Sequence, residues 1–297
     1  MKTESSKIPL ERIHQGKVRD VYQVDDQHLL MVASDRLSAF DVVLPDAIPH
    51  KGVLLTQISN YWFQMMRPII KNHLTRIPVI QVIPDADEDL IQRTVVVKKL
   101  RALPCEAIVR GYIIGSGWKD YQNNGEICGI QLPKNLQQAE QLPEALFTPS
   151  SKAQVGGHDE NISFDQLVNL IGQERADELR SVSLEIYRQA SQHASKNGII
   201  IADTKFEFGL DEDDNLVLMD EVLTPDSSRF WNQASYQVGS SPESYDKQFI
   251  RDYLETLDWN KQAPGPHVPQ NLINKTAEKY QEAYRKITGN DFLSEIY

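Results

Sequence analysis

Residues 199–222 read IIIADTKFEFGLDEDDNLVLMDEV, and this stretch predicts a β-hairpin. Two apolar runs flank an acidic turn, which is the usual pattern of two adjacent antiparallel strands. Successive side chains in a strand point to opposite faces, so one face is predicted to carry three charged groups: Asp203, Lys205 and Glu207. The opposite face is predicted to be buried and to carry Thr204, Phe206 and Phe208.

The second strand of the hairpin adds carboxylates at Asp220 and Glu221. Asp220 is expected near Lys205 or Glu207, in a register that the sequence leaves open. Carboxylates beside an apolar layer are costly unless a cation neutralises them, and nucleotide-bound Mg²⁺ would do so. The alternative is a solvated face with a surface ion pair. The loop TPDSSR (224–229) favours a site, because an Arg and hydroxyls after a carboxylate strand are typical of anion binding.

The acidic turn at 211–215 has the D-x-D-x-N spacing of a calcium loop but fails two of its requirements. Leu216 stands where such a loop needs glycine, and Val222 stands where it needs a bidentate glutamate. An exposed turn is therefore predicted here.

Outward from the hairpin, the sequence predicts a strand-rich first third and a more helical remainder. Strands are expected at 18–23, 28–33, 78–83, 94–100 and 105–110. Helices are expected at 53–66, before Pro68, and at 174–197, before the Gly198 cap. Loop or turn is expected at 122–158, which Asn-Gly and prolines punctuate. The tail from Ser241 is expected to be helical on both sides of a proline-rich linker at 263–269.

Composition limits the classes of partner. The chain has 297 residues, 40% of them hydrophobic and 25% charged, as in a globular protein of one large or two medium domains. The net charge of −11 disfavours a nucleic-acid partner. No run approaches the roughly 20 apolar residues of a membrane span and the start lacks a signal-peptide core, so we predict no membrane partner and a cytoplasmic location. Cys105 and Cys128 are predicted to be structural thiols.

Four further segments carry groups suited to anionic ligands: GKVRDVY (16–22), SDRLSAFD (34–41), CEAIVRGYIIGSGWKDY (105–121) and TPSSKAQVGGHDENIS (148–163). They combine cations, hydroxyls and glycines that let the backbone approach a ligand. Each also has a structural interpretation as a strand start, a capped helix, a tight turn or a polar loop. Zinc at the cluster His158-Asp159-Glu160 is disfavoured, because no second His lies at usable spacing.

Taken in order, six blocks resemble the SAICAR synthetase family: GKVRDVY, SDRLSAFDVVLPDAIPHKG, VVKKLRALPCEAIVRGYIIGSGWKDY, LFTPSSKAQVGGHDENIS, IADTKFEFG and MDEVLTPDSSRFW. They span residues 16–231. The resemblance implies an α+β, two-lobed fold. Residues 1–120 would form an antiparallel β-rich nucleotide-binding lobe, similar to that of kinases and ATP-grasp enzymes. Residues 121–297 would form a larger α+β lobe with the hairpin 199–222 and a helical tail.

The resemblance also implies the reaction and its site. ATP would drive the joining of carboxyaminoimidazole ribonucleotide (CAIR) to L-aspartate through an acyl phosphate, with Mg²⁺ held by Glu207 and Asp220. ATP would be bound between the lobes by Gly16, Lys17, Val18, Arg19, Lys99, Leu103 and Glu106. The other substrates would be bound by Ser34, Arg36, Ser38, Asp41, Arg110, Ser116, Lys152, Lys205, Ser228 and Arg229. The catalytic groups would be Lys205 and Asp203, both at the aspartate, and Arg229.

Two alternatives belong to other functional classes. A small-molecule or protein kinase would share a lysine-bearing hairpin and a carboxylate metal site, but the sequence lacks the HRD and DFG patterns of protein kinases. A nucleotide-binding module without catalysis is disfavoured, because binding alone does not need Lys205, Glu207 and Asp220 together. The length of the chain resembles the longer family members and favours a monomer. The sequence leaves the oligomeric state and the order of substrate addition open.

Overall fold

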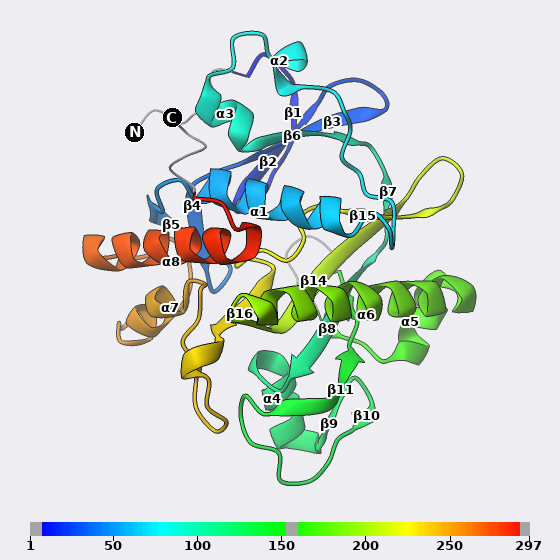
Figure 1. Cartoon of the computed structure of the whole chain (residues 1–297), viewed down its shortest axis with the longest axis vertical. Coiled ribbons are helices and arrows are strands. Elements are labelled where there is room, and N and C mark those ends of the chain that lie inside the picture. The colour runs from blue at the N-terminus through cyan, green and yellow to red at the C-terminus, as the bar shows by residue number, and fades with distance from the viewer. Residues whose placement is uncertain (1–7, 153–159, 292–297) are drawn as a thin grey trace. The chain divides into compact units, whose positions relative to one another are not determined.

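The computed structural model describes residues 8–152 and 160–291, and its contacts divide the chain into two compact units. Unit 1 consists of Met1–Tyr61, His73–Lys99 and Asp246–Tyr297, and unit 2 of Trp62–Asn72 and Leu100–Tyr245. Helices and antiparallel sheets confirm the predicted α+β class (Figure 1). The units differ from the predicted ranges 1–120 and 121–297. The reason is that the strand after residue 104 pairs within unit 2, whereas the tail packs in unit 1.

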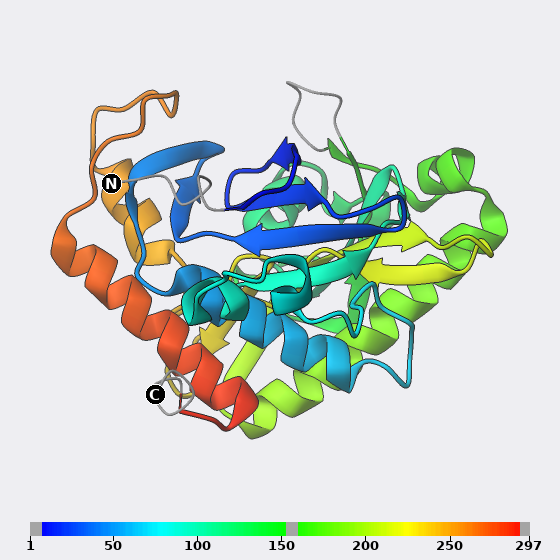
Figure 2. The same ribbon diagram turned by 90° about the horizontal axis from the view of Figure 1, so that it is seen from above.

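Unit 1 contains a four-stranded antiparallel sheet in the order β1-β2-β3-β6. Its strands are β1 (Arg12–Gln15), β2 (Arg19–Gln23), β3 (His28–Ala33) and β6 (Thr94–Lys98). Figure 2 shows the blue strands of this sheet side by side. The predicted N-terminal hairpin is confirmed, with Tyr22 opposite Leu30. Alternate apolar side chains of the sheet pack with the segment beside it in one core: Tyr22, Leu30, Val32, Ile83, Leu90 and Val96.

The predicted strand at 78–83 is wrong. Residues Val79–Val82 form one helical turn, α2, and Glu88–Gln92 form α3, whose first turn is capped by the Asp87 side chain. The edge of β6 is already occupied, because Thr75 N–H donates to Val96 (3.1 Å) and Lys98 N–H donates to His73 (2.8 Å). The apolar run therefore does not add to this edge and packs through Val79 and Ile83 instead.

The rest of unit 1 is a separate hairpin and helices. Strands β4 (Arg36–Ala39) and β5 (Val42–Ala47) form a two-stranded sheet of their own. Helix α1 (Lys51–Met65) confirms the predicted helix; it belongs to unit 1 as far as Tyr61, and the Asp35 carboxylate accepts the Gly52 N–H at its start (2.9 Å). The tail contains α7 (Gln248–Glu255) and α8 (Gln270–Thr288), as predicted on either side of the proline-rich linker.

Unit 2 is built around β14 (Ile199–Leu210), the first strand of the predicted hairpin. Its antiparallel neighbours are β8 (Cys105–Tyr112), β15 (Leu216–Met219), β16 (Ser228–Asn232) and the short β7 (Arg101–Ala102). On the far side of β8 the sheet continues through β11 (Gln141–Phe147), β12 (Ser150–Ser151) and β13 (Glu160–Asn161). Phe206 and Phe208 are buried, which confirms the predicted apolar face of the hairpin.

Helices cover this sheet and connect its strands. Helix α6 (Gln173–Lys196) confirms the prediction for 174–197 and packs on β14 and β8 through Leu179, Ile186 and Ala190 (Figure 1). It follows α5 (Phe164–Ile171) and ends before Gly198, whose φ of 73° is the left-handed conformation expected of a cap.

The predicted loop at 122–158 is correct only in part. Its described residues include the end of α4 (Gly115–Asn124), the small hairpin β9 (Glu126–Ile127) and β10 (Ile130–Gln131), and β11. Pro143 lies within β11, where the pairing with β8 shifts register between Gln141 and Leu146. A proline is tolerated at such an irregularity, which explains why its presence did not exclude a strand.

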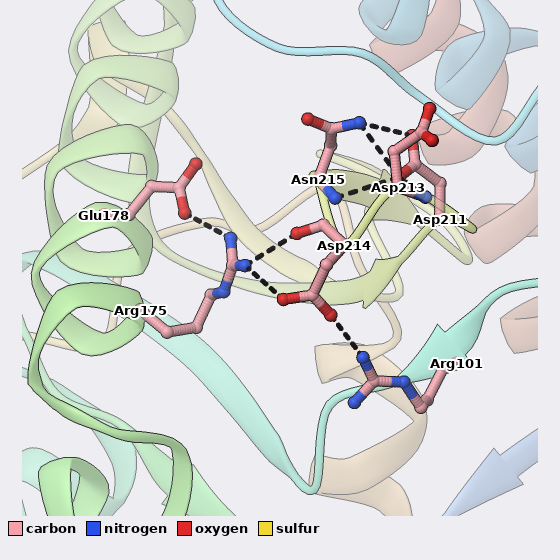
Figure 3. Close-up of polar contacts among 7 residues, drawn as sticks. All are labelled: Arg101, Arg175, Glu178, Asp211, Asp213, Asp214 and Asn215. Carbon is pink, nitrogen blue, oxygen red and sulfur yellow. Dashed lines mark hydrogen bonds and ion pairs between the residues drawn. The ribbon is translucent and has the colours of Figure 1, made fainter.

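The acidic turn between β14 and β15 is the exposed turn that the sequence predicts (Figure 3). Asp211 closes it by accepting the backbone N–H groups of Asp213 (3.1 Å) and Asn215 (2.9 Å). The Asp214 carboxylate lies between two guanidinium groups, Arg101 on β7 and Arg175 on α6 (Figure 3). Asp211 therefore closes the turn, and Asp214 ties it to β7 and α6.

None of the described helices is long and apolar enough to cross a membrane. Cys105 and Cys128 are free thiols, and burial raises the pKa of each to about 11. Both are therefore protonated and poorly nucleophilic at neutral pH, as expected of structural cysteines.

A buried histidine makes unit 1 sensitive to acid. Burial, with a smaller effect of nearby Arg19, lowers the pKa of His73 from 6.5 to about 3. The unfolded chain takes up a proton at this residue below pH 6.5 and the folded chain does not, so stability falls as the pH drops from 6.5 toward 3. We expect His73→Gln to flatten that fall by up to about 1.4 kcal/mol per pH unit. Urea unfolding at several pH values measures the slope. Exposed His14→Gln is the control, and equal slopes in wild type and His73→Gln would contradict the expectation.

Candidate functional site

Four charged side chains meet on the charged face of β14 in unit 2. Lys205 Nζ contacts the Glu106 carboxylate of β8 and lies 3.6 Å from Glu207 Oε1. Lys152 Nζ approaches the other oxygen of Glu207 at 2.6 Å. Lys205 is paired with Ile108, and Glu106 lies two residues from Ile108, so strand alternation puts both charges on one face. The predicted association of Lys205 with Glu207 is confirmed.

Opposing effects set the charge of this lysine. Burial alone would lower the pKa of the Lys205 ammonium. The carboxylates of Glu106, Glu207 and Asp220 outweigh burial, so the pKa is raised above its ordinary value. Lys205 therefore stays protonated throughout the neutral range and cannot act as a base there.

The hairpin register places the second predicted metal ligand just beyond β15. Glu207 is paired with Met219, and Asp220 follows with φ 64°, a conformation uncommon for a residue other than glycine. Asp220 is close enough to raise the pKa of Lys205. The register that the sequence left open therefore puts Asp220 in the electrostatic range of Lys205.

A second charged cluster surrounds Asp203, which is buried on β14. Asp203 is the cross-strand partner of Arg110 on β8 and of Arg229 on β16. Its Oδ2 accepts from Arg110 Nη1 at 3.3 Å and from Arg229 Nη1. Asp203 and Lys205 lie on one face of β14, as predicted, but Asp203 pairs with the two arginines and Lys205 with the two glutamates. Their shared role at aspartate stays a prediction.

The two arginines differ in their hydrogen bonds to the protein and in their exposure. Arg110 donates from Nε to Thr148 Oγ1 and from Nη2 to Ser116 Oγ, both at 3.0 Å, in addition to Asp203. Its side chain is 3% exposed, whereas that of Arg229 is 32% exposed. Arg229 Nη2 lies over Gly115, where an added Cβ would be only 2.3 Å away. Glycine there lets the guanidinium approach the start of α4.

Tyr187 and Thr148 support this cluster, and the sequence interpretation missed both. The pairing of β8 with β14 extends as far as Arg110 and Asp203, and β14 shifts register against β16 between Ile201 and Asp203. At this irregularity the Tyr187 hydroxyl donates to Ile201 C=O at 2.6 Å. A Cβ at Gly111 would lie 2.0 Å from that hydroxyl. Two sequence features are consistent with this contact: Tyr187 lies on the apolar side of α6, and a glycine follows Arg110.

Unit 1 holds the predicted site residues of the first hairpin and of residues 34–41. The Arg36 guanidinium donates to Asp20 (2.8 and 3.2 Å) and to the backbone oxygens of Lys17 and Gly16 (both 3.1 Å). Lys17 pairs with the Asp41 carboxylate, and Ser34 Oγ donates to Val18 C=O at 2.8 Å. Arg36 thus fixes the backbone of the Gly16–Lys17 turn, and Lys17 ties that turn to the hairpin β4–β5.

The remaining predicted residues are positioned by backbone pairing. Ser38 is half-buried on β4, opposite Val43. Lys99 N–H donates to Gln27 C=O at 2.7 Å in unit 1, and Leu103 N–H donates to Phe208 C=O at 2.9 Å in unit 2. Arg19 lies opposite Ala33. His158 and Asp159 fall outside the described residues.

Ser228 is not brought to the charged face. It is paired with Thr204, and its hydroxyl donates to Thr204 Oγ1 at 2.8 Å on the buried side of the sheet. Strand alternation thus gives Ser228 a structural contact, while its neighbour Arg229 faces Asp203.

The carboxylates of Glu207 and Asp220 suit a metal ion that also binds a nucleotide. Among residues 8–152 and 160–291, no three His, Cys, Asp or Glu side chains converge to hold a metal ion. Glu207 and Asp220 are hard oxygen donors of the kind that Mg²⁺ uses when nucleotide phosphates and water complete its shell. The residues therefore fit nucleotide-bound Mg²⁺ and do not form an all-protein metal cage.

Comparisons with known proteins show what the chain is similar to. The family model described as SAICAR synthetase matches residues 12–266. A phosphoribosylaminoimidazole-succinocarboxamide synthase of Methylobacillus flagellatus is 58% identical over 97% of this chain and 98% of its own length. One of Neisseria meningitidis serogroup B is 57% identical over 95% of this chain and 99% of its own length.

Solved structures are also similar. The SAICAR synthase of Saccharomyces cerevisiae, complexed with SAICAR, superposes with a TM-score of 0.89 and 42% identity, covering 98% of this chain and 99% of its own. A SAICAR synthetase in complex with ADP superposes with a TM-score of 0.70 and 26% identity, covering 94% of this chain and 98% of its own.

Proposed function

The chain belongs to the SAICAR synthetase family, and from that membership we infer that it joins CAIR to L-aspartate in purine biosynthesis. The reaction uses ATP and gives succinylaminoimidazolecarboxamide ribonucleotide (SAICAR), ADP and phosphate. The observation that carries this conclusion is the near-complete match of both chains, 97% of this one and 98% of the relative. Relatives solved with SAICAR and with ADP support small-molecule substrates.

We propose that the reaction passes through an acyl phosphate. The CAIR carboxylate is a poor acyl donor, so one of its oxygens first takes the γ-phosphoryl group of ATP and ADP leaves. The amine of aspartate then attacks the acyl carbon, phosphate leaves with its bonding electrons, and the amine loses a proton. Phosphoryl transfer needs positioning and charge neutralisation more than covalent help from the protein. The charged face of β14 could supply both.

We propose the following roles for the charged residues. Glu207 and Asp220 would hold nucleotide-bound Mg²⁺, and the ion would neutralise charge on the phosphates. Lys205, kept cationic by its carboxylate neighbours, orients the carboxylates of aspartate. Arg229, the more exposed guanidinium at Asp203, binds an anionic group of CAIR, and Lys152 adds a cation beside Glu207.

The assignments to unit 1 and some broader predictions rest on the family resemblance. Binding of ATP phosphates at the Gly16–Arg19 segment and of CAIR by Ser34, Arg36, Ser38 and Asp41 remain predictions. The monomeric state and the cytoplasmic location are also proposals. Size-exclusion chromatography with light scattering would test the first, and cell fractionation the second.

An ADP-release assay separates the ligase from a kinase. We expect steady-state ADP release to require both CAIR and L-aspartate, because the acyl phosphate is discharged by the amine. Omission of either substrate should abolish sustained release. Release at the full rate with CAIR alone would identify a kinase, and binding of ATP without any release would identify a non-catalytic module.

The magnesium proposal predicts the behaviour of Glu207→Gln. The amide keeps the shape of Glu207 and removes its charge, so we expect the Mg²⁺ concentration for half-maximal turnover to rise at least roughly tenfold. A Mg²⁺ titration of initial rates measures this. Glu212→Gln, an identical change on the exposed turn of the same hairpin, is the matched control. Identical Mg²⁺ dependence in both variants would remove Glu207 from the metal site.

A further inference from the structure

The hairpin β4–β5 needs support from outside its own strands. It forms a two-stranded sheet by itself, and such hairpins are marginally stable unless another layer covers one face. Its turn consists of Phe40 (φ 51°) and Asp41 (φ 65°), both in the left-handed region that non-glycine residues seldom adopt. Ser38 and Asp41, two of the proposed substrate-binding residues, lie on this hairpin.

Residues 259–268, here named the strap, cover the tip of this hairpin. The ring of Trp259 lies edge-to-face against Phe40, with 6.3 Å between ring centroids. Lys261 Nζ lies 4.4 Å from the centroid of the Phe40 ring. One aromatic side chain at the strained turn is thus held by an aromatic ring and a cation of the strap.

The strap continues along the same face to the base of the hairpin. An added Cβ at Gly265 would lie 2.5 Å from Leu44 Cδ2, so the strap backbone packs directly on that side chain. Asp46 accepts the Val268 N–H at 2.7 Å and faces His267 Nδ1 at 3.2 Å. Because side chains alternate, Val42, Leu44 and Asp46 project from one face of β5, and that face is the one the strap covers.

The first residues of the strap, near the hairpin tip, are fixed by contacts of their own. Trp259 Nε1–H donates to Gln262 C=O at 2.8 Å, and Lys261 Nζ pairs with Glu255 of α7 at 2.8 Å. Helices α7 and α8 flank it on both sides in sequence. A short segment fixed at its ends loses little conformational freedom when it packs, which makes its contacts effective.

We propose that the strap is a positioning element for substrate binding: it supplies the missing layer of the β4–β5 hairpin and holds Ser38 and Asp41 in their binding conformation. Trp259, Lys261 and Gly265 are positioning residues that act through Phe40 and Leu44. The part of this proposal that concerns substrate rests on the proposed role of the hairpin. The part that concerns order in the hairpin rests on the contacts alone.

Two strap variants and one matched control test it in the full-length enzyme. Gly265→Ala pushes the strap away from Leu44, and its backbone φ lies outside the left-handed region. Lys261→Met removes the cation above Phe40. Lys275→Met is the control, because it removes an equivalent cation that lies 3.6 Å from the Phe249 ring in the same tail.

Amide hydrogen exchange of residues 36–47 and the KM for each substrate are measured together. We expect exchange in this segment to quicken roughly tenfold in both strap variants and the KM for CAIR to rise by roughly fivefold to tenfold. The KM for ATP and both readouts in Lys275→Met should stay at wild-type values.

The two readouts separate two kinds of failure. If amide exchange of residues 36–47 stays at the wild-type rate in both strap variants, the proposal that the strap supports the hairpin is overturned. Faster exchange with an unchanged KM for CAIR is judged against Ser38→Ala. If Ser38→Ala raises that KM, the positioning role is overturned. If Ser38→Ala also leaves it unchanged, the substrate role of the hairpin has failed, while the strap as its supporting layer stands.

Discussion

Lys205→Met is expected to lower turnover by roughly 10²- to 10³-fold, the loss typical when one preorganised charge is removed from an active site. In the structure this ammonium joins Glu106 to Glu207. The proposed role is orientation of aspartate, so the second chemical step should suffer more than the first. The measurement is positional exchange of oxygen in ATP labelled at the β,γ-bridge, with CAIR present and aspartate absent.

The outcome of that exchange decides the role. Exchange that survives in Lys205→Met while product formation collapses supports orientation of aspartate. Loss of exchange at saturating Mg²⁺ would show that Lys205 acts in phosphoryl transfer. Lys152→Met is the matched comparison, because it removes the other cation from Glu207 and leaves Lys205 in place. Equal effects of the two variants would mean that neutralisation of Glu207 explains both.

The protonation state of Lys205 adds a constraint on the chemistry. Its carboxylate neighbours raise its pKa above the ordinary lysine value despite burial. Lys205 therefore cannot take the proton that the aspartate amine loses near neutral pH. The same pKa shift means that the ion pairs stabilise the fold fully below the ordinary lysine pKa, and that this contribution is lost as the pH rises through the raised value.

Much of the site could be predicted because its residues are close in sequence. The alternation of Asp203, Lys205 and Glu207 with Phe206 and Phe208 fixes which side of β14 is charged. The helix at 174–197 and its Gly198 cap follow from local periodicity and local backbone preference. The family blocks add the reaction, which no local pattern here could define alone.

The parts that could not be predicted depend on contacts between distant segments. Lys205 and Glu106 are 99 residues apart, and Arg110 and Asp203 are 93 residues apart. These pairs exist because β8 lies beside β14 in one register, and a slip of one residue would reverse the faces. The failed strand at 78–83 has the same cause, because the edge of β6 is filled by residues that the sequence does not mark.

The two arginines at Asp203 should respond differently to the same substitution. The family resemblance implied that both bind a substrate other than ATP, and on that basis Arg→Lys would weaken substrate binding in both. The structure changes that expectation for Arg110. Each of its three guanidinium nitrogens already donates to the protein, to Thr148, Asp203 and Ser116. Arg229 is about ten times more exposed, at 32% against 3%.

Arg229→Lys should therefore keep the fold and weaken CAIR binding by about 1.5–3 kcal/mol, because the charge remains and the fork is lost. Arg110→Lys should instead lower the free energy of unfolding, by up to the about 3–5 kcal/mol that follows when a buried ion pair is broken. Urea unfolding and the KM for CAIR are measured on both proteins. Thr148→Val removes the acceptor of Arg110 Nε and a long bond from Thr148 Oγ1 to Ile108 C=O (3.4 Å), and it should shift stability in the same direction by a smaller amount. A stable Arg110→Lys with a raised KM for CAIR would return Arg110 to the substrate site.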